Sequence, residues 1–249
     1  MKVLSIGNSF SQDAHKWLHK LAQKNGVDIE SANLYIGGCT LEMHWNNVLG
    51  NKADYSLELN GARGERFVSL YEALTMDEWD VVTLQQASPF SGRPQSYFPY
   101  LPNLVNLVRE LQPSAKIYFY QTWSYERDRE SSSFNAYNCD QKEMFRRIED
   151  ASEMASKVIG APIIYVGRVI QNLRENVEEF DYKKGGLSLN RDGFHLTLDY
   201  GRFAAAATFF CTLTGKHVKI DGFEDFDADI LKKIIKTVED TVFGTEEKE

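Results

Sequence analysis

Two short segments near opposite ends of the chain contain the residue types of a serine nucleophile and its catalytic base. Ser9 stands between a short apolar segment, residues 1–6, and a predicted helix over residues 13–24. Asp192 and His195 lie three residues apart near the other end, which puts both side chains on one side of a turn. A serine hydroxyl becomes a good nucleophile when an imidazole accepts its proton. A carboxylate then orients that imidazole and stabilises its positive charge. If the two segments meet in space, they predict a serine hydrolase.

The elements that must position these residues alternate between strands and helices. Short apolar segments read as strands, and segments of helical length and periodicity separate them. Such an alternation predicts a parallel sheet covered on both faces, with right-handed crossovers. We therefore expect one α/β domain over residues 1–249, a three-layer α/β/α sandwich around a five-stranded parallel sheet. Residues 51–64 alternate in part and leave room for an additional hairpin. The five predicted strands are residues 1–6, 29–36, 80–84, 116–120 and 162–166.

A serine on the turn between the first strand and its helix has its hydroxyl at the carboxyl edge of the sheet, where open α/β folds bind ligands. Taken alone, Ser9 could simply cap the helix, since serine and asparagine are preferred at that position. Asp192 could likewise be a turn residue, and His195 a half-buried histidine with satisfied hydrogen bonds. Their joint occurrence favours the catalytic interpretation.

Composition and charge exclude several classes of partner. The 249 residues carry a formal net charge of -8, which argues against nucleic acid or an anionic membrane as the main partner. No apolar run approaches the ~20 residues needed to span a bilayer. The amino terminus lacks the features of a signal peptide, so we expect a cytoplasmic protein unless a leader was removed. Three widely spaced cysteines, Cys39, Cys139 and Cys211, indicate neither a disulfide framework nor a metal site.

Four sequence blocks occur in an order that resembles a known superfamily. They read GNSFS, GGCT, LQQAS and DGFHLT, and they begin at residues 7, 37, 84 and 192. This order is similar to that of the SGNH (GDSL-like) hydrolases, in particular to a bacterial branch of that superfamily. The resemblance extends from Val3 to about Gly215 and implies the flavodoxin-like SGNH hydrolase fold. It implies no metal and no organic cofactor.

Site residues follow from this resemblance one by one. Ser9 matches the nucleophile of the family, and Asp192 and His195 match its Asp-x-x-His pair. Gly38 matches the glycine whose backbone N–H helps to bind the oxyanion. One departure is Asn8, which stands where the family usually has an aspartate, and the fold should tolerate this change.

A second departure concerns the oxyanion hole. The block that usually offers an asparagine in a GxND motif reads Gln85-Gln86-Ala87-Ser88 here. We expect the amide of Gln85 or Gln86 to take the third donor position, beside the backbone N–H groups of Ser9 and Gly38. Loss of one such donor typically costs about 3–4 kcal/mol of transition-state stabilisation.

Aromatic residues and histidine in or near the predicted loops indicate the substrate. We expect His44 and Trp123 to rim the site, which would suit a sugar or an acyl chain. The leading hypothesis is a serine esterase that removes a small acyl group, an acetyl group above all, from a carbohydrate through an acyl-enzyme. A lipase or thioesterase on the same triad is one alternative, and a non-catalytic carbohydrate-binding module is another. The expected partner is a small-molecule or oligosaccharide ester, and the sequence leaves the oligomeric state open.

Overall fold

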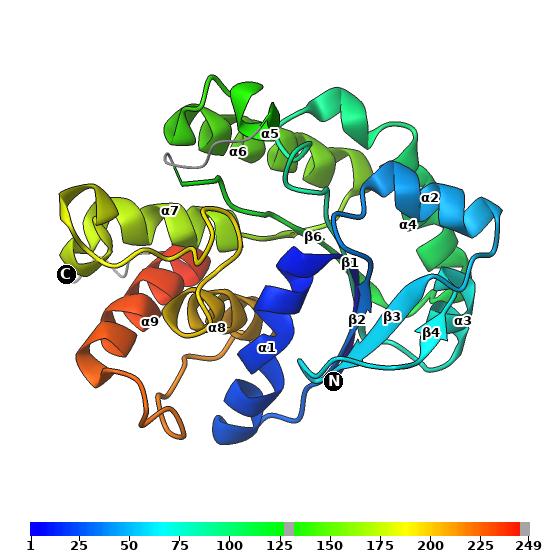
Figure 1. Ribbon diagram of the computed structural model, residues 1–249. Helices are drawn as coiled ribbons and strands as arrows, with labels where there is room; N and C mark the ends of the chain where they lie inside the picture. Colours follow the sequence, from blue (N-terminus) through cyan, green and yellow to red (C-terminus); the bar gives the residue numbers. More distant parts are fainter. Residues whose placement is uncertain (127–131, 245–249) are drawn as a thin grey trace.

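A seven-stranded sheet forms the centre of the protein, as the computed structural model of residues 1–126 and 132–244 shows (Figure 1). The strand order is β4-β3-β2-β1-β5-β6-β7. Strands β2, β1, β5, β6 and β7 run parallel, whereas β3 is antiparallel to β2 and β4 is antiparallel to β3. The strands are β1 Lys2–Gly7, β2 Glu30–Tyr35, β3 Tyr55–Leu59, β4 Phe67–Val68, β5 Val81–Leu84, β6 Lys116–Tyr120 and β7 Ile163–Ile164.

The predicted number of strands is wrong, although all five predicted strands are present and parallel. The first additional strand, β3, lies in the stretch where the sequence leaves room for a hairpin, and the second, β4, lies just after it. Tyr55, Leu57 and Glu58 of β3 are buried, so this segment can extend the sheet beyond β2. The sheet therefore gains an antiparallel edge, which a sheet in an α/β protein commonly carries.

Two hydrophobic cores, one on each face of the sheet, make the three layers. Successive side chains of the central strand β1 point to opposite faces, as expected for a strand. Val3 belongs to the core on one face, and Leu4 and Ile6 belong to the core on the other. Strand β5 follows the same rule, because Val81 and Val82 contribute to different cores. The predicted α/β/α sandwich is thus confirmed.

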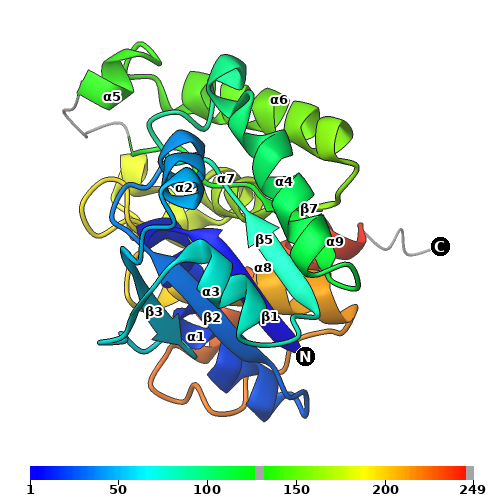
Figure 2. The same ribbon diagram turned by 90° about the vertical axis from the view of Figure 1, so that its right-hand side faces the viewer.

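Helices cover both faces of the sheet, as the turned view shows (Figure 2). Helices α1, α8 and α9 pack together on one face, and α2, α3 and α4 pack together on the other. Alanines of α8 let it approach α1 closely, since all four from position 204 to 207 are fully buried. The helices are α1 Ser9–Lys24, α2 Leu41–Leu49, α3 Leu70–Thr75, α4 Tyr100–Leu111, α5 Ser132–Asn135, α6 Gln141–Ile159, α7 Val166–Asn176, α8 Tyr200–Thr214 and α9 Ala228–Phe243.

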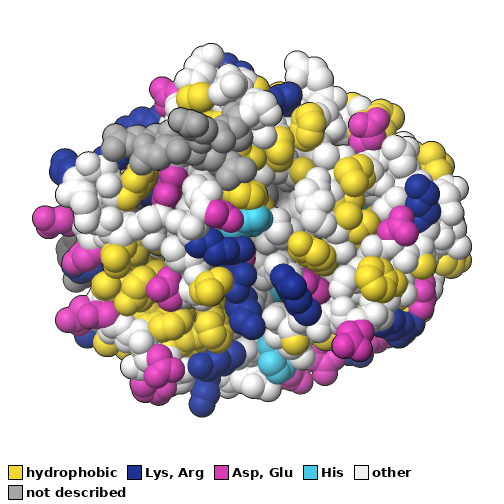
Figure 3. Space-filling view, viewed as in Figure 1, with side chains coloured by type: hydrophobic (Ala, Val, Ile, Leu, Met, Phe, Trp, Pro, Cys, Tyr) yellow, Lys and Arg dark blue, Asp and Glu magenta, His cyan; other side chains and the backbone are white. Residues whose placement is uncertain are grey.

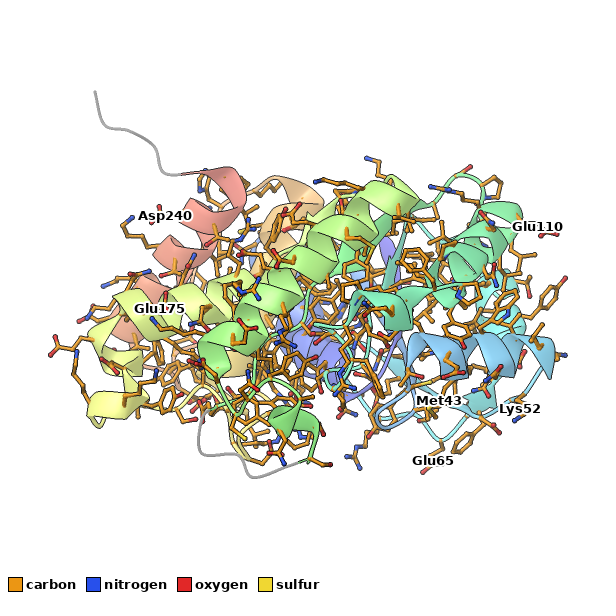
Figure 4. All side chains as sticks on the ribbon, turned by 90° about the horizontal axis from the view of Figure 1, so that it is seen from above. Met43, Lys52, Glu65, Glu110, Glu175 and Asp240 are labelled. Carbon is orange, nitrogen blue, oxygen red and sulfur yellow. The ribbon has the colours of Figure 1, made fainter. Side chains whose placement is uncertain are left out.

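Apolar side chains fill the space between the layers of this sandwich, and most charged side chains lie on its outside, with Asp13, Glu58, Glu126 and Arg174 among the buried exceptions. The view from above shows the labelled Lys52, Glu65 and Glu110 at the periphery (Figure 4). Among the described residues, no helix combines the length and the apolar character that crossing a membrane requires. The carboxyl ends of the central strands β1 and β5 meet at one edge of the sheet, and the candidate site is built there.

Candidate active site

The structure brings the three predicted catalytic side chains together at the carboxyl edge of the sheet. His195 Nε2 lies 2.9 Å from Ser9 Oγ, although 186 residues separate the two in the chain. On the other side of the ring, His195 Nδ1 lies 2.7 Å from Asp192 Oδ2. This is the connectivity in which an imidazole can take a proton from the serine while a carboxylate orients the ring.

Asp192 is held in its charged form by the residues that follow it. Its Oδ1 accepts hydrogen bonds from the backbone N–H groups of His195, at 2.7 Å, and Phe194, at 3.2 Å. Burial alone would raise the pKa of the Asp192 carboxyl, but the hydrogen bonds from the ring and backbone of His195 outweigh it, so the pKa lies below its usual value. An ionised Asp192 can therefore orient and stabilise the imidazole.

The turn that carries Ser9 is a helix cap, and the capping residue is Asn8 rather than Ser9. Asn8 Oδ1 accepts a hydrogen bond from Phe10 N–H, as is typical of an N-cap asparagine. Asn8 Nδ2 donates to the carbonyl oxygen of Cys39, which ties this turn to the glycine loop after β2. Ser9 is thus the first residue of α1, and its hydroxyl is left to pair with His195.

Gly7 is required at the end of β1 because no side chain fits there. A Cβ atom at this position would lie 2.0 Å from Ser11 Oγ. The Ser11 hydroxyl occupies this space because it accepts from the Asn8 backbone N–H and lies 2.7 Å from Asn33 Oδ1 on β2. The close approach of these groups fixes the path of the chain just before the nucleophile.

Asp13 anchors the loop that carries His195, and sequence reasoning missed it. Its side chain is fully buried and accepts from Arg191, at 3.1 Å, and Arg202, at 2.7 Å. The backbone N–H of Leu196 donates to the same carboxylate at 2.9 Å. An acidic residue on the buried face of an amphipathic helix was the available signal, because a buried carboxylate needs cationic partners.

Aromatic rings pack against the imidazole of His195. The Phe194 ring lies 3.8 Å from the His195 ring, and Phe10 lies 5.9 Å from it, measured between centroids. Trp123 stacks on Phe10 at 4.1 Å and donates from Nε1 to the Phe194 carbonyl oxygen. Trp123 is fully buried, so the prediction that it rims the site is wrong. It packs under the site instead.

His44 is also buried rather than exposed at the rim, and this prediction is wrong as well. It lies on the buried face of α2, where its Nδ1 is 3.0 Å from the hydroxyl of Tyr55 and 3.5 Å from Cys39 Sγ. Burial lowers the pKa of His44 to about 3, so the ring is neutral. The apolar core around Tyr55 explains why this histidine turns inward.

Neither predicted glutamine lines the pocket beside Ser9 and His195. Gln85 Nε2 donates to Asn8 Oδ1 at 2.8 Å. Gln86 Oε1 accepts from Leu41 N–H, and its Nε2 donates to Ser96. The Gln85 amide therefore supports the helix cap and the Gln86 amide joins the loops at Leu41 and Ser96, so neither has the placement expected of the third oxyanion donor.

A pocket of about 320 Å³ opens beside Ser9 and His195. Gly38 lines it from the loop after β2, where its positive φ of 67° turns the backbone. Ser88 Oγ and the Tyr125 hydroxyl lie 2.9 Å apart, and both residues line the same pocket. Its volume is near the lower end of the range for small-molecule sites. Across the described chain, no cluster of three or more His, Cys, Asp or Glu side chains is placed to hold a metal ion.

Comparison with protein families identifies the chain. The model of DUF4886, a domain of unknown function, matches residues 2–234. The chain belongs to the DUF4886 family. The crystal structure of a DUF4886 family protein from Bacteroides uniformis is 35% identical in sequence, with a TM-score of 0.89 over 98% of this chain and 95% of that one. No curated protein matches this DUF4886 protein in sequence.

More distant structures place this DUF4886 protein in the SGNH hydrolase fold. A Slackia heliotrinireducens protein described as a candidate SGNH hydrolase is 20% identical, with a TM-score of 0.56 over 86% of this chain and 98% of that one. A mutant of Axe2, an acetyl-xylooligosaccharide esterase from Geobacillus, is 12% identical, with a TM-score of 0.54 over 88% and 96% of the two chains. These similarities show a shared fold, and they confirm the fold that the sequence blocks predicted.

Proposed function

We propose that this DUF4886 protein is a serine esterase that works through Ser9, His195 and Asp192. The observation that carries the proposal is the pair of hydrogen bonds on the two ring nitrogens of His195, 2.9 Å to Ser9 and 2.7 Å to Asp192. Such an arrangement activates a serine hydroxyl for attack on an acyl carbon. The hydrolase fold of the relatives supports the proposal.

The reaction would proceed in two halves. His195 accepts the proton of Ser9 as Oγ attacks the ester carbonyl carbon, and the resulting imidazolium then gives this proton to the departing alcohol. The acyl group remains on Ser9. A water molecule, deprotonated by His195, attacks the acyl-enzyme, and the proton returns to Ser9 as the carboxylic acid leaves. Asp192 stabilises the imidazolium in both halves.

The oxyanion of each tetrahedral intermediate would face the Ser9 and Gly38 backbone N–H groups. Both residues line the pocket. Within the block from Gln85 to Ser88, Ser88 is the residue that lines the pocket, so its hydroxyl replaces the predicted glutamine amide as the side-chain donor. Donors that are already in place stabilise the developing charge without reorganisation.

A small acyl group on a carbohydrate is the substrate that the pocket supports best. Its volume of about 320 Å³ suits a short acyl chain. Aromatic residues Tyr35, Tyr125 and Phe194 line it, and aromatic side chains offer an apolar surface to sugar rings. The fold shared with an acetyl-xylooligosaccharide esterase supports the same substrate class.

Covalent labelling and a chain-length series test this function. A fluorophosphonate probe should label Ser9, and Ser9→Ala should abolish labelling and lower kcat for p-nitrophenyl acetate by at least about 10⁴-fold. Activity should fall from acetyl to octanoyl esters, because the pocket is small. An optimum at long chains would favour the lipase or thioesterase alternative. Sugar binding without hydrolysis of any ester would favour the binding module.

A further inference from the structure

A band of cationic side chains runs along the surface from residues 191–196, the loop that carries His195 and is called the base loop below, over α1 (Figure 3). Figure 3 shows Lys and Arg side chains gathered there, beside a histidine and an acidic residue. We define the basic stripe as Lys16, Arg63, Arg191 and Arg202. Lys16, Arg63 and Arg191 are exposed, and Arg202 is partly buried. A positive surface is notable in a chain with 36 acidic and 28 basic residues.

The upper part of the basic stripe is held together by one buried carboxylate. Asp13 pairs with both Arg191 and Arg202. Its side chain is fully buried, so the pair of guanidinium groups has two positive charges above one negative charge. Arg191 directly precedes Asp192 in the chain, so this end of the basic stripe adjoins the triad.

A second buried acid, Glu58, interacts with the lower part of the basic stripe. Burial raises the pKa of Glu58, while the nearby charges of Arg63 and Arg202 act in the opposite direction. Both arginines are therefore close enough to Glu58 to interact with it electrostatically. Lys16 Nζ approaches the carbonyl oxygen of Gly61 at 3.4 Å, which joins α1 to the turn that carries Arg63.

Both acids lie under the cations rather than among them. Asp13 is fully buried and Glu58 is only 4% exposed. These two carboxylates are therefore shielded from solvent, whereas Asp192, which follows Arg191 in the chain, is 41% exposed at the end of the basic stripe. Farther along α1, the exposed Glu224 interacts electrostatically with Lys24 and Lys20, so one carboxylate offsets part of the positive charge there.

We propose that the basic stripe binds the anionic part of the substrate, a saccharide chain that carries carboxylate or sulfate groups. Guanidinium groups suit both anions because they can donate two parallel hydrogen bonds. A chain bound along the basic stripe would place a neighbouring ester at Ser9, and this link alone rests on the proposed esterase function. Four cations on a protein of net charge -8 favour a saccharide with fewer charges per unit length than nucleic acid, rather than nucleic acid or an anionic membrane.

Binding to the full-length Ser9→Ala variant tests the proposal without turnover. Fluorescence anisotropy would measure the Kd for a labelled oligogalacturonate, a sulfated oligosaccharide of similar length and a neutral xylooligosaccharide. We expect one or both anionic probes to bind, with the Kd rising about tenfold or more between 50 and 200 mM salt because counterions are released. The better of the two identifies carboxylate or sulfate as the recognised group. Equal binding of the neutral chain would overturn the proposal.

Charge-reversal variants locate the binding on the surface. In the Ser9→Ala background, Lys16→Glu with Arg63→Glu should raise the Kd at least tenfold. The matched control, Lys232→Glu with Lys236→Glu on exposed α9, makes the same charge change and should leave the Kd within twofold. Lys16→Gln with Arg63→Gln should give a smaller loss, and it replaces the reversal if that variant does not fold. Equal losses in the basic-stripe and control variants, or tighter binding of duplex DNA or anionic vesicles, would refute the proposal.

The two proposals can fail separately. If the oligogalacturonate binds through the basic stripe but the wild-type protein hydrolyses no ester, the esterase function is wrong and the anion site remains. If the wild-type protein hydrolyses acetyl esters but no anionic probe binds through the basic stripe, the anion site is wrong and the esterase function remains.

Discussion

The two halves of the candidate triad are held in place in different ways. The nucleophile turn, residues 7–11, begins with the last residue of β1, runs into α1 and is shaped by local hydrogen bonds of Asn8 with Phe10 and Ser11. Longer-range hydrogen bonds to Asn33, Cys39 and Gln85 then tie this turn to neighbouring strands and loops. The base loop, residues 191–196, contains no helix, and its only strand-like pairing is one isolated β-bridge from Leu196 to Asn190. It is fixed to α1 by Asp13, which lies 178 residues from Arg191 and 183 from Leu196.

The positions of Ser9 and His195 therefore depend on different kinds of contact. A helix cap sets the position of Ser9 with local hydrogen bonds, which form whenever the helix forms. The position of His195 depends on a buried carboxylate that is satisfied only when the base loop is docked. Changes in the two regions should therefore have distinguishable effects on activity and stability, and three variants test this.

The largest expected effect is on activity, in the base loop. Asp192→Asn should lower kcat by about 10⁴-fold, because the amide no longer favours the ring tautomer that accepts the serine proton. Its stability should change by less than about 1 kcal/mol, since the side chain is 41% exposed and exposed pairs contribute little. Ester hydrolysis and urea unfolding measure the two quantities. The control is Asp229→Asn, which changes an exposed acid on α9. If Asp192→Asn keeps a kcat within tenfold of the wild-type value, the proposed role of Asp192 is wrong.

The next largest effect is on stability, at the anchor of the base loop. Asp13→Ala should lower the free energy of unfolding by about 3–5 kcal/mol, because it removes the fully buried carboxylate that accepts from Arg191, Arg202 and the Leu196 N–H. Asp229→Ala removes an exposed ion pair with Lys232 and should cost less than about 1 kcal/mol. Urea denaturation compares the two variants. If Asp13→Ala and Asp229→Ala lower the free energy of unfolding equally, Asp13 does not hold the base loop.

The smallest effect is at the cap of the nucleophile turn. Asn8→Ala should cost about 1–2 kcal/mol of stability through the lost cap. It should also lower kcat about tenfold or more, because the hydrogen bond from Asn8 to Cys39 positions the loop that contains Gly38, and misplaced oxyanion donors reduce catalysis. Asp227→Ala removes the equivalent cap of α9 far from the site. A similar loss of kcat in both variants would mean that the Asn8 effect is general rather than local.

Much of the fold could be predicted from the sequence because the strands are short, apolar and separated by helical patterns. The five parallel strands were predicted at nearly the right positions. Of the two edge strands, β3 lies within residues 51–64, where the sequence leaves room for a hairpin, whereas β4, Phe67–Val68, was not predicted because its two residues carry no strand pattern of their own and depend on pairing with β3. The helix α1 begins at Ser9 rather than at Asp13, since the Asn8 cap allows the helix to start earlier.

Side-chain roles that depend on burial were the least predictable. His44 and Trp123 follow strands in the sequence, where loop positions are expected to be exposed. In the structure both pack inward, one on Tyr55 and the other on Phe10. Gln85 and Gln86 follow β5 at the correct edge of the sheet, but their amides satisfy backbone and cap groups instead of facing the pocket.

The sequence by itself determined the residue types of the candidate triad, their order and the parallel sheet, because strand and helix patterns and motif spacing are local properties of the chain. Only the tertiary structure decided that Ser9 and His195 share a hydrogen bond, that Asp13 anchors the base loop and that the cations of the basic stripe lie together. These depend on contacts between residues more than 40 positions apart. Such contacts form only when burial and charge pairing are satisfied across the whole fold.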